Sequence, residues 1–290
     1  MNADDFGLTS GVNRAIAELH RAGVLTSATL MARAAATDEA IAIAHATPTL
    51  GVGCHVVLVD GDPVLSPRDI PTLADPVTGR FPSTLVDFLR WLYRDRHYAP
   101  DSRANRELEA EAAAQIASLQ SRGLRLTHID THKHTHMFPA VLRAVLRAAR
   151  AAGIARVRNP FEPSWSRSAT PGAPFVRRAE VALLRSLEPR FRRIVAEEGF
   201  TTTSGSLGVL ATGTLDQPTI ASLLRALPSG TFELVSHPGY HDRDLQQART
   251  RLLHSRETEM AALQTLAGHP SLKLISFADL AVTALTSTVP

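Results

Sequence analysis

Short apolar runs rich in β-branched residues alternate along the chain with longer segments that are rich in Ala, Leu and Arg and have helical periodicity. This alternation is typical of βα units built on a mainly parallel sheet. The pattern predicts strands at 26–31, 51–59, 126–132, 155–158, 201–209, 231–237 and 272–276. It predicts helices at 12–22, 37–46, 102–122, 139–152, 217–226 and 244–266.

Seven predicted strands with helices between them indicate an α/β fold, a TIM-barrel-like (β/α) barrel that is incomplete at about seven strands. An open doubly wound sheet has the same local pattern and is the alternative. The repeat is interrupted at 60–82, which is rich in Pro and Asp, and at 159–199, where several prolines precede an Arg-rich helix. No linker composition separates two units. We therefore expect one domain over residues 1–290, with both interruptions as walls of the substrate site.

Composition narrows the classes of protein that this chain can be. Hydrophobic residues make up 44% and charged residues 20% of the 290 residues, a balance that supports a packed core. No apolar stretch approaches the roughly 20 residues of a membrane-spanning helix, and no secretion signal is evident, so we expect a cytoplasmic protein. Arginines are scattered between acids along the predicted helices, and we therefore expect no nucleic-acid partner. The single cysteine, Cys54, excludes a cysteine-based zinc cluster, so a metal must bind histidine and carboxylate side chains.

The segment 127–136 has the sequence THIDTHKHTH and holds four of the 12 histidines. If it is extended, side-chain alternation places one set of polar residues on one face: His128, Asp130, His132, His134 and His136. Side chains two residues apart on a strand are separated by about 6.5 Å, so a single ion can bind only one or two of them. The others would contact substrate or orient a ligand, as Asp130 would through a ring nitrogen. The alternative is a solvated, histidine-rich loop.

Two adjacent carboxylates, Asp4 and Asp5, precede a glycine turn and a predicted helix. At a strand end, one of them can bind a metal while the other takes a proton from a bound water. The alternative is that both acids only stabilise the N-terminus of the following helix through its dipole.

Two further histidines lie in or at the end of predicted strands. His55 is embedded in the apolar run 51–59, where the alternative is a core histidine with a satisfied hydrogen bond. His237 ends the run 231–237 before a Pro-Gly turn, a position suited to acid–base chemistry, and the alternative is an ordinary turn histidine. Together, the four segments place one Asp and three His at strand ends. An Asp/His/His set with an open position lowers the pKa of a zinc-bound water toward about 7, which favours a hydrolase.

The motifs NADDFG (2–7), GCH (53–55), THIDTHKHTH with MFP (127–139) and HPGY (237–240) follow one another along nearly the whole chain. In these motifs the chain resembles the YdjC/ChbG family of carbohydrate deacetylases, and the stretch 55–80 most resembles its hopanoid-biosynthesis-associated HpnK branch. The resemblance implies a TIM-barrel-like fold and metal-dependent N-deacetylation of an acetylated amino sugar. For the HpnK branch, the implied substrate is an N-acetylglucosaminyl hopanoid glycolipid, cleaved to acetate and a free amine.

The resemblance also implies the roles of individual residues. Asp5, His55 and His132 would bind one divalent metal ion, with zinc as the first choice and magnesium or another divalent ion as alternatives. Asp4 would be the general base and His237 the general acid. The family resemblance further implies a homodimer.

Substrate contacts are expected outside these motifs. Arg158 follows a predicted strand and is expected to contact a sugar hydroxyl, with a surface ion pair as the alternative. If the substrate is a glycolipid, part of the segment 159–199 would face the lipid or the membrane surface with a set of apolar side chains: Phe161, Trp165, Phe175, Val176 and Leu183.

Three other functions compete with this prediction. A chitooligosaccharide deacetylase would carry out the same chemistry on a different substrate. A metal-dependent phosphohydrolase is disfavoured because the sequence has no Gly-rich phosphate cradle. A non-catalytic metal- or sugar-binding protein is the alternative outside enzymology. Asp4 and His237 argue against it, because metal binding alone needs neither residue.

Overall fold

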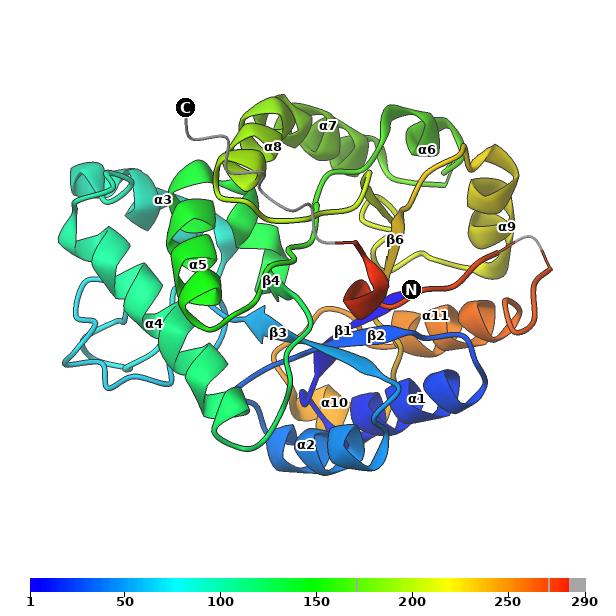
Figure 1. Cartoon of the computed structure of the whole chain (residues 1–290), viewed down its shortest axis with the longest axis horizontal. Coiled ribbons are helices and arrows are strands. Elements are labelled where there is room, and N and C mark those ends of the chain that lie inside the picture. Colours follow the sequence, from blue (N-terminus) through cyan, green and yellow to red (C-terminus); the bar gives the residue numbers. More distant parts are fainter. Residues whose placement is uncertain (171, 271, 282–290) are drawn as a thin grey trace, which may run out of the picture.

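A sheet of six parallel strands lies at the centre of the computed structural model, which describes residues 1–170, 172–270 and 272–281 (Figure 1). The strands are β1 (Asn2–Phe6), β2 (Ser27–Leu30), β3 (Gly51–Val56), β4 (Ile129–Thr131), β5 (Ser206–Leu207) and β6 (Glu233–Ser236). Their order across the sheet is β4-β3-β2-β1-β6-β5, so β1 lies in the interior of the sheet. Because all strands are parallel, their carboxyl ends meet at one edge of the sheet.

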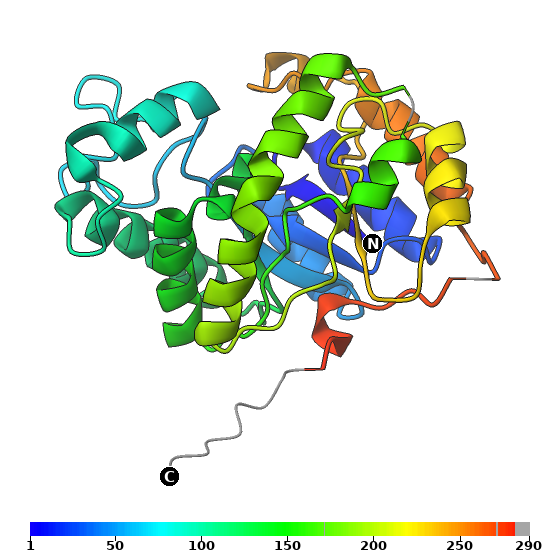
Figure 2. The same cartoon turned by 90° about the horizontal axis from the view of Figure 1, so that it is seen from above.

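Helices surround this sheet on several sides (Figures 1 and 2). The α-helices of the described residues are α1 (Ser10–Arg21), α2 (Thr37–Ala46), α3 (Leu85–Tyr93), α4 (Arg103–Gln120), α5 (Pro139–Ala151), α6 (Ser164–Ser168), α7 (Phe175–Leu184), α8 (Glu188–Glu197), α9 (Gln217–Ala226), α10 (Arg243–Gln247) and α11 (Ser255–Gln264). In Figure 1, α1, α2 and α10 lie below the strands, α11 lies beside them on the right, and α6, α7 and α8 lie above them. Among the described helices, none has both the length and the apolar character needed to span a membrane.

The α/β prediction is confirmed, but the barrel of about seven strands is not formed by the described residues. They form a half-barrel sheet of six strands. The segment 155–158 makes only isolated parallel bridges, from Val157 to Ile129 and from Arg156 to Thr201, and the segment 272–276 forms no strand. Both segments have the apolar pattern of a strand but lack a continuous hydrogen-bonded ladder, which a local sequence pattern does not reveal.

Strand β1 forms although the sequence pattern did not predict it. Its residues NADDF include Asn and Asp, which are depleted in strands, yet all five are buried. Its register with β2 is irregular between Ala3 and Phe6, where the two carboxylates Asp4 and Asp5 lie. Both acidic side chains contact arginines from later parts of the chain, Asp4 with Arg158 and Asp5 with Arg256.

The helix predictions are confirmed most closely where the periodicity is local. The helices at 37–46 and 217–226 have the predicted bounds, and α1, α4 and α5 differ from theirs by at most two residues at either end. The predicted helix 244–266 is instead two helices, because Ala248 takes extended backbone angles and ends α10. The segment 60–82 is irregular, as predicted, and 159–199 holds α6, α7 and α8 where one helix was expected.

Candidate metal and active site

Strand β1 presents Asp5 with its two carboxylate oxygens in different surroundings. The residue has φ 64°, a left-handed backbone conformation that is uncommon for a non-glycine residue and is often found at functional sites. Its Oδ2 accepts a hydrogen bond from Arg256 Nη2 at 2.6 Å, whereas Oδ1 is buried and accepts no hydrogen bond from the described residues. Burial alone would raise the pKa of Asp5, but the Arg256 guanidinium holds it well below its usual range. Asp5 is therefore a carboxylate with one free, buried oxygen.

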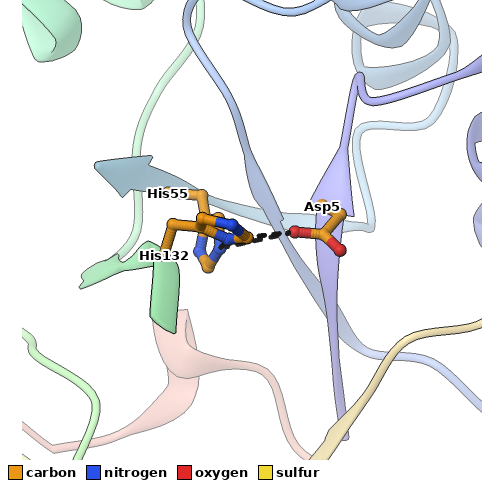
Figure 3. A group of neighbouring side chains, drawn as sticks. All are labelled: Asp5, His55 and His132. Atoms are coloured by element: carbon orange, nitrogen blue, oxygen red, sulfur yellow. Dashed lines mark hydrogen bonds and ion pairs between the residues drawn. The ribbon is translucent and has the colours of Figure 1, made fainter. Parts of the chain in front are cut away.

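Strands β3 and β4 bring His55 and His132 to that oxygen (Figure 3). His55 pairs in register with Asp130, and its Nδ1 lies 2.7 Å from Asp130 Oδ1, which leaves Nε2 free to face Asp5. His132 follows the last residue of β4, in a 3-10 turn (His132–Met137). The Nε2 atom of His55 lies 3.7 Å from Asp5 Oδ1 and 3.3 Å from His132 Nδ1, and His132 Nδ1 lies 3.4 Å from Asp5 Oδ1.

The spacing of these three atoms fits a metal ion. With bonds of about 2.0–2.1 Å, ligand atoms around a tetrahedral zinc ion are separated by roughly 3.3–3.4 Å. Two of the three separations, at 3.3 and 3.4 Å, lie in that range, and the third is 3.7 Å. The side chain of His132 is 19% exposed, whereas those of Asp5 and His55 are 5% and 2% exposed, so the group opens to solvent beside His132.

Charge also favours a cation at this position. Burial by itself would lower the pKa of His55, but Asp130, Asp4 and Asp5 raise it to about 9. The carboxylates thus favour a proton on His55 when no metal ion is bound. A divalent ion would supply that charge and displace the proton, because a histidine ligand must be deprotonated.

A second buried cluster lies directly beside the first and is centred on Arg158. This side chain is 0% exposed, and its guanidinium contacts Asp4 at 2.6 Å, Asp130 at 2.5 Å and Glu233 at 2.7 Å. Although burial would raise the pKa of Asp4, Arg158 holds it well below its usual range. Burial raises the pKa of Glu233 to about 7 in spite of the same guanidinium. The expected contact of Arg158 with a sugar hydroxyl, and the alternative of a surface ion pair, are therefore both wrong.

His237 lies next to Asp4, directly after the last residue of β6. Its Nε2 is 3.9 Å from Asp4 Oδ2, and its Nδ1 is 3.7 Å from Glu259 Oε2 on α11. Glu259 also accepts a hydrogen bond from the backbone N–H of His237 at 2.6 Å. Burial would lower the pKa of His237, but Glu259 outweighs it and raises this pKa above its ordinary value. His237 is thus a partly exposed imidazole beside the site, and its surroundings favour the protonated form.

The expected alternation of side chains in 127–136 is wrong beyond Thr131, because the chain leaves the sheet there. Lys133 and His134 have φ 54° and 53°, so His132, His134 and His136 do not share one extended face. His136 is held by Thr131 Oγ1 and the Arg158 carbonyl, at 2.8 and 3.2 Å. Burial lowers the pKa of His136 to about 4 and that of His134 well below its usual range, which keeps both rings neutral.

His128 does not belong to the three-residue group. Its ring stacks on Phe277 with a centroid separation of 3.8 Å, and burial lowers its pKa to about 3. A Cβ at Gly53 would come within 2.5 Å of this ring, which explains the glycine in the GCH motif. His128 is therefore a packed, neutral histidine.

Sequence reasoning missed three charged residues that complete the site: Glu233, Arg256 and Glu259. Arg256 and Glu259 lie one turn apart on α11, on the same buried face. Two buried charged residues on one helical face are the signal that could have found them, but it becomes visible only once burial is known.

Of the apolar side chains expected at a lipid surface, Phe175 and Leu183 are 82% and 74% exposed. Phe161 is buried, Trp165 is packed against the core, and the side chain of Val176 lies outside the described side chains.

The fold and the site together define a class of protein: an α/β half-barrel with an Asp/His/His group at the carboxyl ends of its parallel strands. The chain belongs to the family of YdjC-like proteins, whose family model matches residues 1–269.

Curated and solved relatives agree with this assignment. A carbohydrate deacetylase of Thermoanaerobacter pseudethanolicus is 26% identical over 245 residues, which cover 84% of this chain and 82% of that protein. A carbohydrate deacetylase of Brevibacillus brevis is 42% identical over 134 residues, 46% of this chain and 48% of that protein. Apart from the Thermoanaerobacter protein, the chain spans about half the length of the curated relatives that it matches. A solved structure of an Enterococcus faecalis V583 protein, named for cellobiose-phosphate cleavage, has a TM-score of 0.69 and 26% identity over 91% of this chain and 88% of that one.

Proposed function

We propose that this protein is a metal-dependent N-deacetylase that hydrolyses the acetamide of an N-acetylated amino sugar to acetate and a free amine. The observation that carries the proposal is the convergence of Asp5 Oδ1, His55 Nε2 and His132 Nδ1, three mutually facing ligand atoms. The names of the curated relatives, carbohydrate deacetylases, support the same reaction. The proposal takes the whole chain as one domain, with 60–82 and 159–199 as walls of the substrate site.

The residues that would hold the metal are Asp5, His55 and His132, and the fit of their spacing makes zinc the first choice. Magnesium and other divalent ions stay alternatives, because a mixed oxygen and nitrogen set also admits them. When bound, such an ion supplies positive charge that polarises the acetyl carbonyl and lowers the pKa of a water molecule. Asp130 fixes the ring of His55 through Nδ1 and thereby keeps Nε2 available.

Asp4 and His237 would move the two protons of the reaction. Asp4 is ionised across the physiological pH range because of Arg158, so it can accept the proton of the attacking water as this water bonds to the amide carbon. Nε2 of His237, which lies 3.9 Å from Asp4 Oδ2, would donate a proton to the sugar nitrogen as the carbon–nitrogen bond breaks.

The finer proposal on substrate is an N-acetylglucosaminyl hopanoid glycolipid, with a chitooligosaccharide as the alternative. The support for the glycolipid is the resemblance of the stretch 55–80 to the HpnK branch and the exposed apolar side chains of Phe175 and Leu183 on α7. Contact with a membrane surface, a cytoplasmic location and a homodimer belong to the same proposal and stay predictions.

The test is acetate release from chitobiose, N-acetylglucosamine and an N-acetylglucosaminyl hopanoid, each with and without a chelator. We expect release from the hopanoid substrate, its loss with chelator and its recovery on adding zinc. Acetate release that chelator does not affect would contradict metal dependence. Acetate release from chitobiose alone would show that the substrate is a chitooligosaccharide and not the glycolipid. Zinc binding with no release from any of them would favour the non-catalytic binding protein.

The two proton-transfer roles are tested by Asp4→Asn and His237→Ala. Both variants should retain zinc and lose roughly 100-fold or more in kcat, the usual scale for an acid or base. Unchanged kcat in Asp4→Asn would reject the base assignment, and loss of zinc would show that the residue serves the metal group instead.

A further inference from the structure

One fully buried arginine of α11 reaches the metal-facing carboxylate and has no part in the roles proposed above. The Arg256 side chain is 0% exposed, and its Nη2 lies 2.6 Å from Asp5 Oδ2, a contact that joins positions 251 residues apart in the chain. Its Nε donates to the Leu252 carbonyl at 3.0 Å, which fixes the guanidinium at a second point. Arg256 is therefore fixed at two points and contacts one oxygen of Asp5 only.

Space for this arginine is provided by the HPGY motif. A Cβ at Gly239 would lie 3.0 Å from Arg256 Cδ and 3.0 Å from Val12 Cγ2, closer than most Cβ contacts. The glycine lets the stem of Arg256 pass between α1 and the turn after β6. The HPGY motif thus contains both His237 and the glycine that leaves space for Arg256.

The contact divides the two oxygens of Asp5 between different partners. Oδ2 is occupied by the guanidinium, whereas Oδ1 faces His55 Nε2 and His132 Nδ1. A carboxylate can bind a metal through one oxygen or through both, and the choice changes the coordination number. The guanidinium on Oδ2 competes with a metal for that oxygen and so favours the one-oxygen mode, which keeps the ligand set small and leaves a coordination position open.

We propose that Arg256 is a positioning residue that makes Asp5 a one-oxygen metal ligand and aims Oδ1 at His55 and His132. The proposal rests on the metal site of the proposed function. The competing explanation is a purely structural ion pair, in which Arg256 neutralises a buried carboxylate and has no influence on how that carboxylate binds metal. The two explanations differ in what they predict for the coordination of a bound ion.

The experiment compares the wild type with Arg256→Met, Arg256→Lys and Arg251→Met. Arg251 is exposed, so Arg251→Met makes the same chemical change away from the site and is the matched control. Zinc affinity is measured by competition with a chromophoric chelator, and the visible absorption spectrum is recorded with Co²⁺ alone. The spectrum reports coordination number, because four-coordinate Co²⁺ absorbs much more strongly than five- or six-coordinate Co²⁺.

We expect Arg256→Met to bind zinc about 10- to 100-fold more weakly, the range for loss of a group that orients a ligand. Its Co²⁺ absorption should be weaker than that of the wild type, because Asp5 can then bind through both oxygens. Arg256→Lys, which keeps the charge but not the fork of donors, should show the same two changes to a smaller extent. Arg251→Met should match the wild type.

Wild-type zinc affinity and a wild-type Co²⁺ spectrum in folded Arg256→Met would overturn the proposal and leave a structural ion pair. If Arg256→Met does not fold, Arg256→Lys decides: an unchanged Co²⁺ spectrum there contradicts the positioning role. A wild-type protein that binds neither Zn²⁺ nor Co²⁺ contradicts the proposed function itself, so failure of the metal site is distinguishable from failure of the role of Arg256.

Discussion

Two clusters of titratable residues lie side by side at the carboxyl ends of the strands, and they differ in how fully an arginine neutralises their carboxylates. In the first, Asp5, His55 and His132 point three ligand atoms at one another, and Asp5 Oδ1 accepts no hydrogen bond from the described residues. In the second, Asp4 and Asp130 converge on the guanidinium of Arg158. Both Asp5/His55/His132 and Asp4/His55/Asp130 have spacings that could hold a metal ion.

The difference indicates which cluster takes the ion. Burying a carboxylate is costly unless a positive charge or several hydrogen bonds compensate it. Arg158 supplies that positive charge to the second cluster. It also contacts a third acid, Glu233, at 2.7 Å. The first cluster has Arg256 on Oδ2 alone, and the opposite face of Asp5 is left for another cation. A metal ion is therefore expected between Asp5, His55 and His132, and not between Asp4 and Asp130.

The largest expected effect comes from removing a ligand of the first cluster. His132→Ala should lower zinc affinity by more than about 100-fold and abolish acetate release, since loss of even an orienting group costs 10- to 100-fold. The matched control is His134→Asn, two residues further along the same turn, where Asn tolerates the left-handed backbone. Chelator competition should show zinc affinity within a few-fold of wild type for this control. Equal losses in both variants would show that the turn, and not the ligand, is responsible.

Removing the cation of the second cluster should cost folding stability. Arg158→Met leaves Asp4, Asp130 and Glu233 buried without their partner, and a change of this kind costs about 3–5 kcal/mol. Urea unfolding at pH 8 measures the loss. It should be smaller at pH 5, because burial without Arg158 raises the pKa of these carboxyls and they then take up protons in the folded state. Adding Glu233→Gln to Arg158→Met should restore part of the stability. A loss of less than about 0.5 kcal/mol in the free energy of unfolding of Arg158→Met would contradict the role of Arg158.

The sequence predicted the parts of this arrangement that depend on local pattern. The strand at 51–59 and the helix at 37–46 are present because apolar runs and helical periodicity act over a few residues. The structure also brings together Asp5, His55 and His132, which the motif resemblance had named. These residues lie at strand ends, and parallel strands end at one edge of a sheet.

The remaining parts depend on partners that are far apart in the sequence. β1 was missed because Asn2–Phe6 is a poor strand sequence, which Arg158 and Arg256 stabilise from 154 and 251 residues away. Arg256 could not be singled out from 31 basic residues by composition, and Arg158 was singled out but not as the partner of buried acids. The alternation expected after Thr131 failed for a similar reason, since the turn at Lys133 and His134 is a matter of backbone conformation and no residue type there requires it.

A smaller effect is expected where the two clusters touch, at Asp130. This carboxylate joins them because Oδ1 contacts His55 Nδ1 at 2.7 Å and Oδ2 contacts Arg158 at 2.5 Å. Asp130→Asn should weaken zinc binding about 10-fold, the lower end of the range for a residue that orients a histidine ligand. It should also lower the pKa of His55, which the charge of Asp130 raises. Zinc affinity measured against pH checks both: with less competition from protons, the affinity of Asp130→Asn should fall less steeply as pH decreases. If zinc affinity in Asp130→Asn depends on pH as in the wild type, Asp130 does not couple the two clusters.

The smallest effect is a change in pH profile at His237, outside both clusters. As the general acid, His237 must be protonated, so kcat falls as pH rises through its pKa. Glu259 raises that pKa, and the fall in the wild type should therefore come at higher pH than an ordinary histidine, about 6.5, would give. Glu259→Gln should move the fall to lower pH and leave kcat below it within a few-fold of the wild type. The control is Glu257→Gln, an exposed position on the same helix. If kcat falls at the same pH in the wild type and in both variants, Glu259 does not set the pKa of the general acid, and the role of His237 as that acid is contradicted.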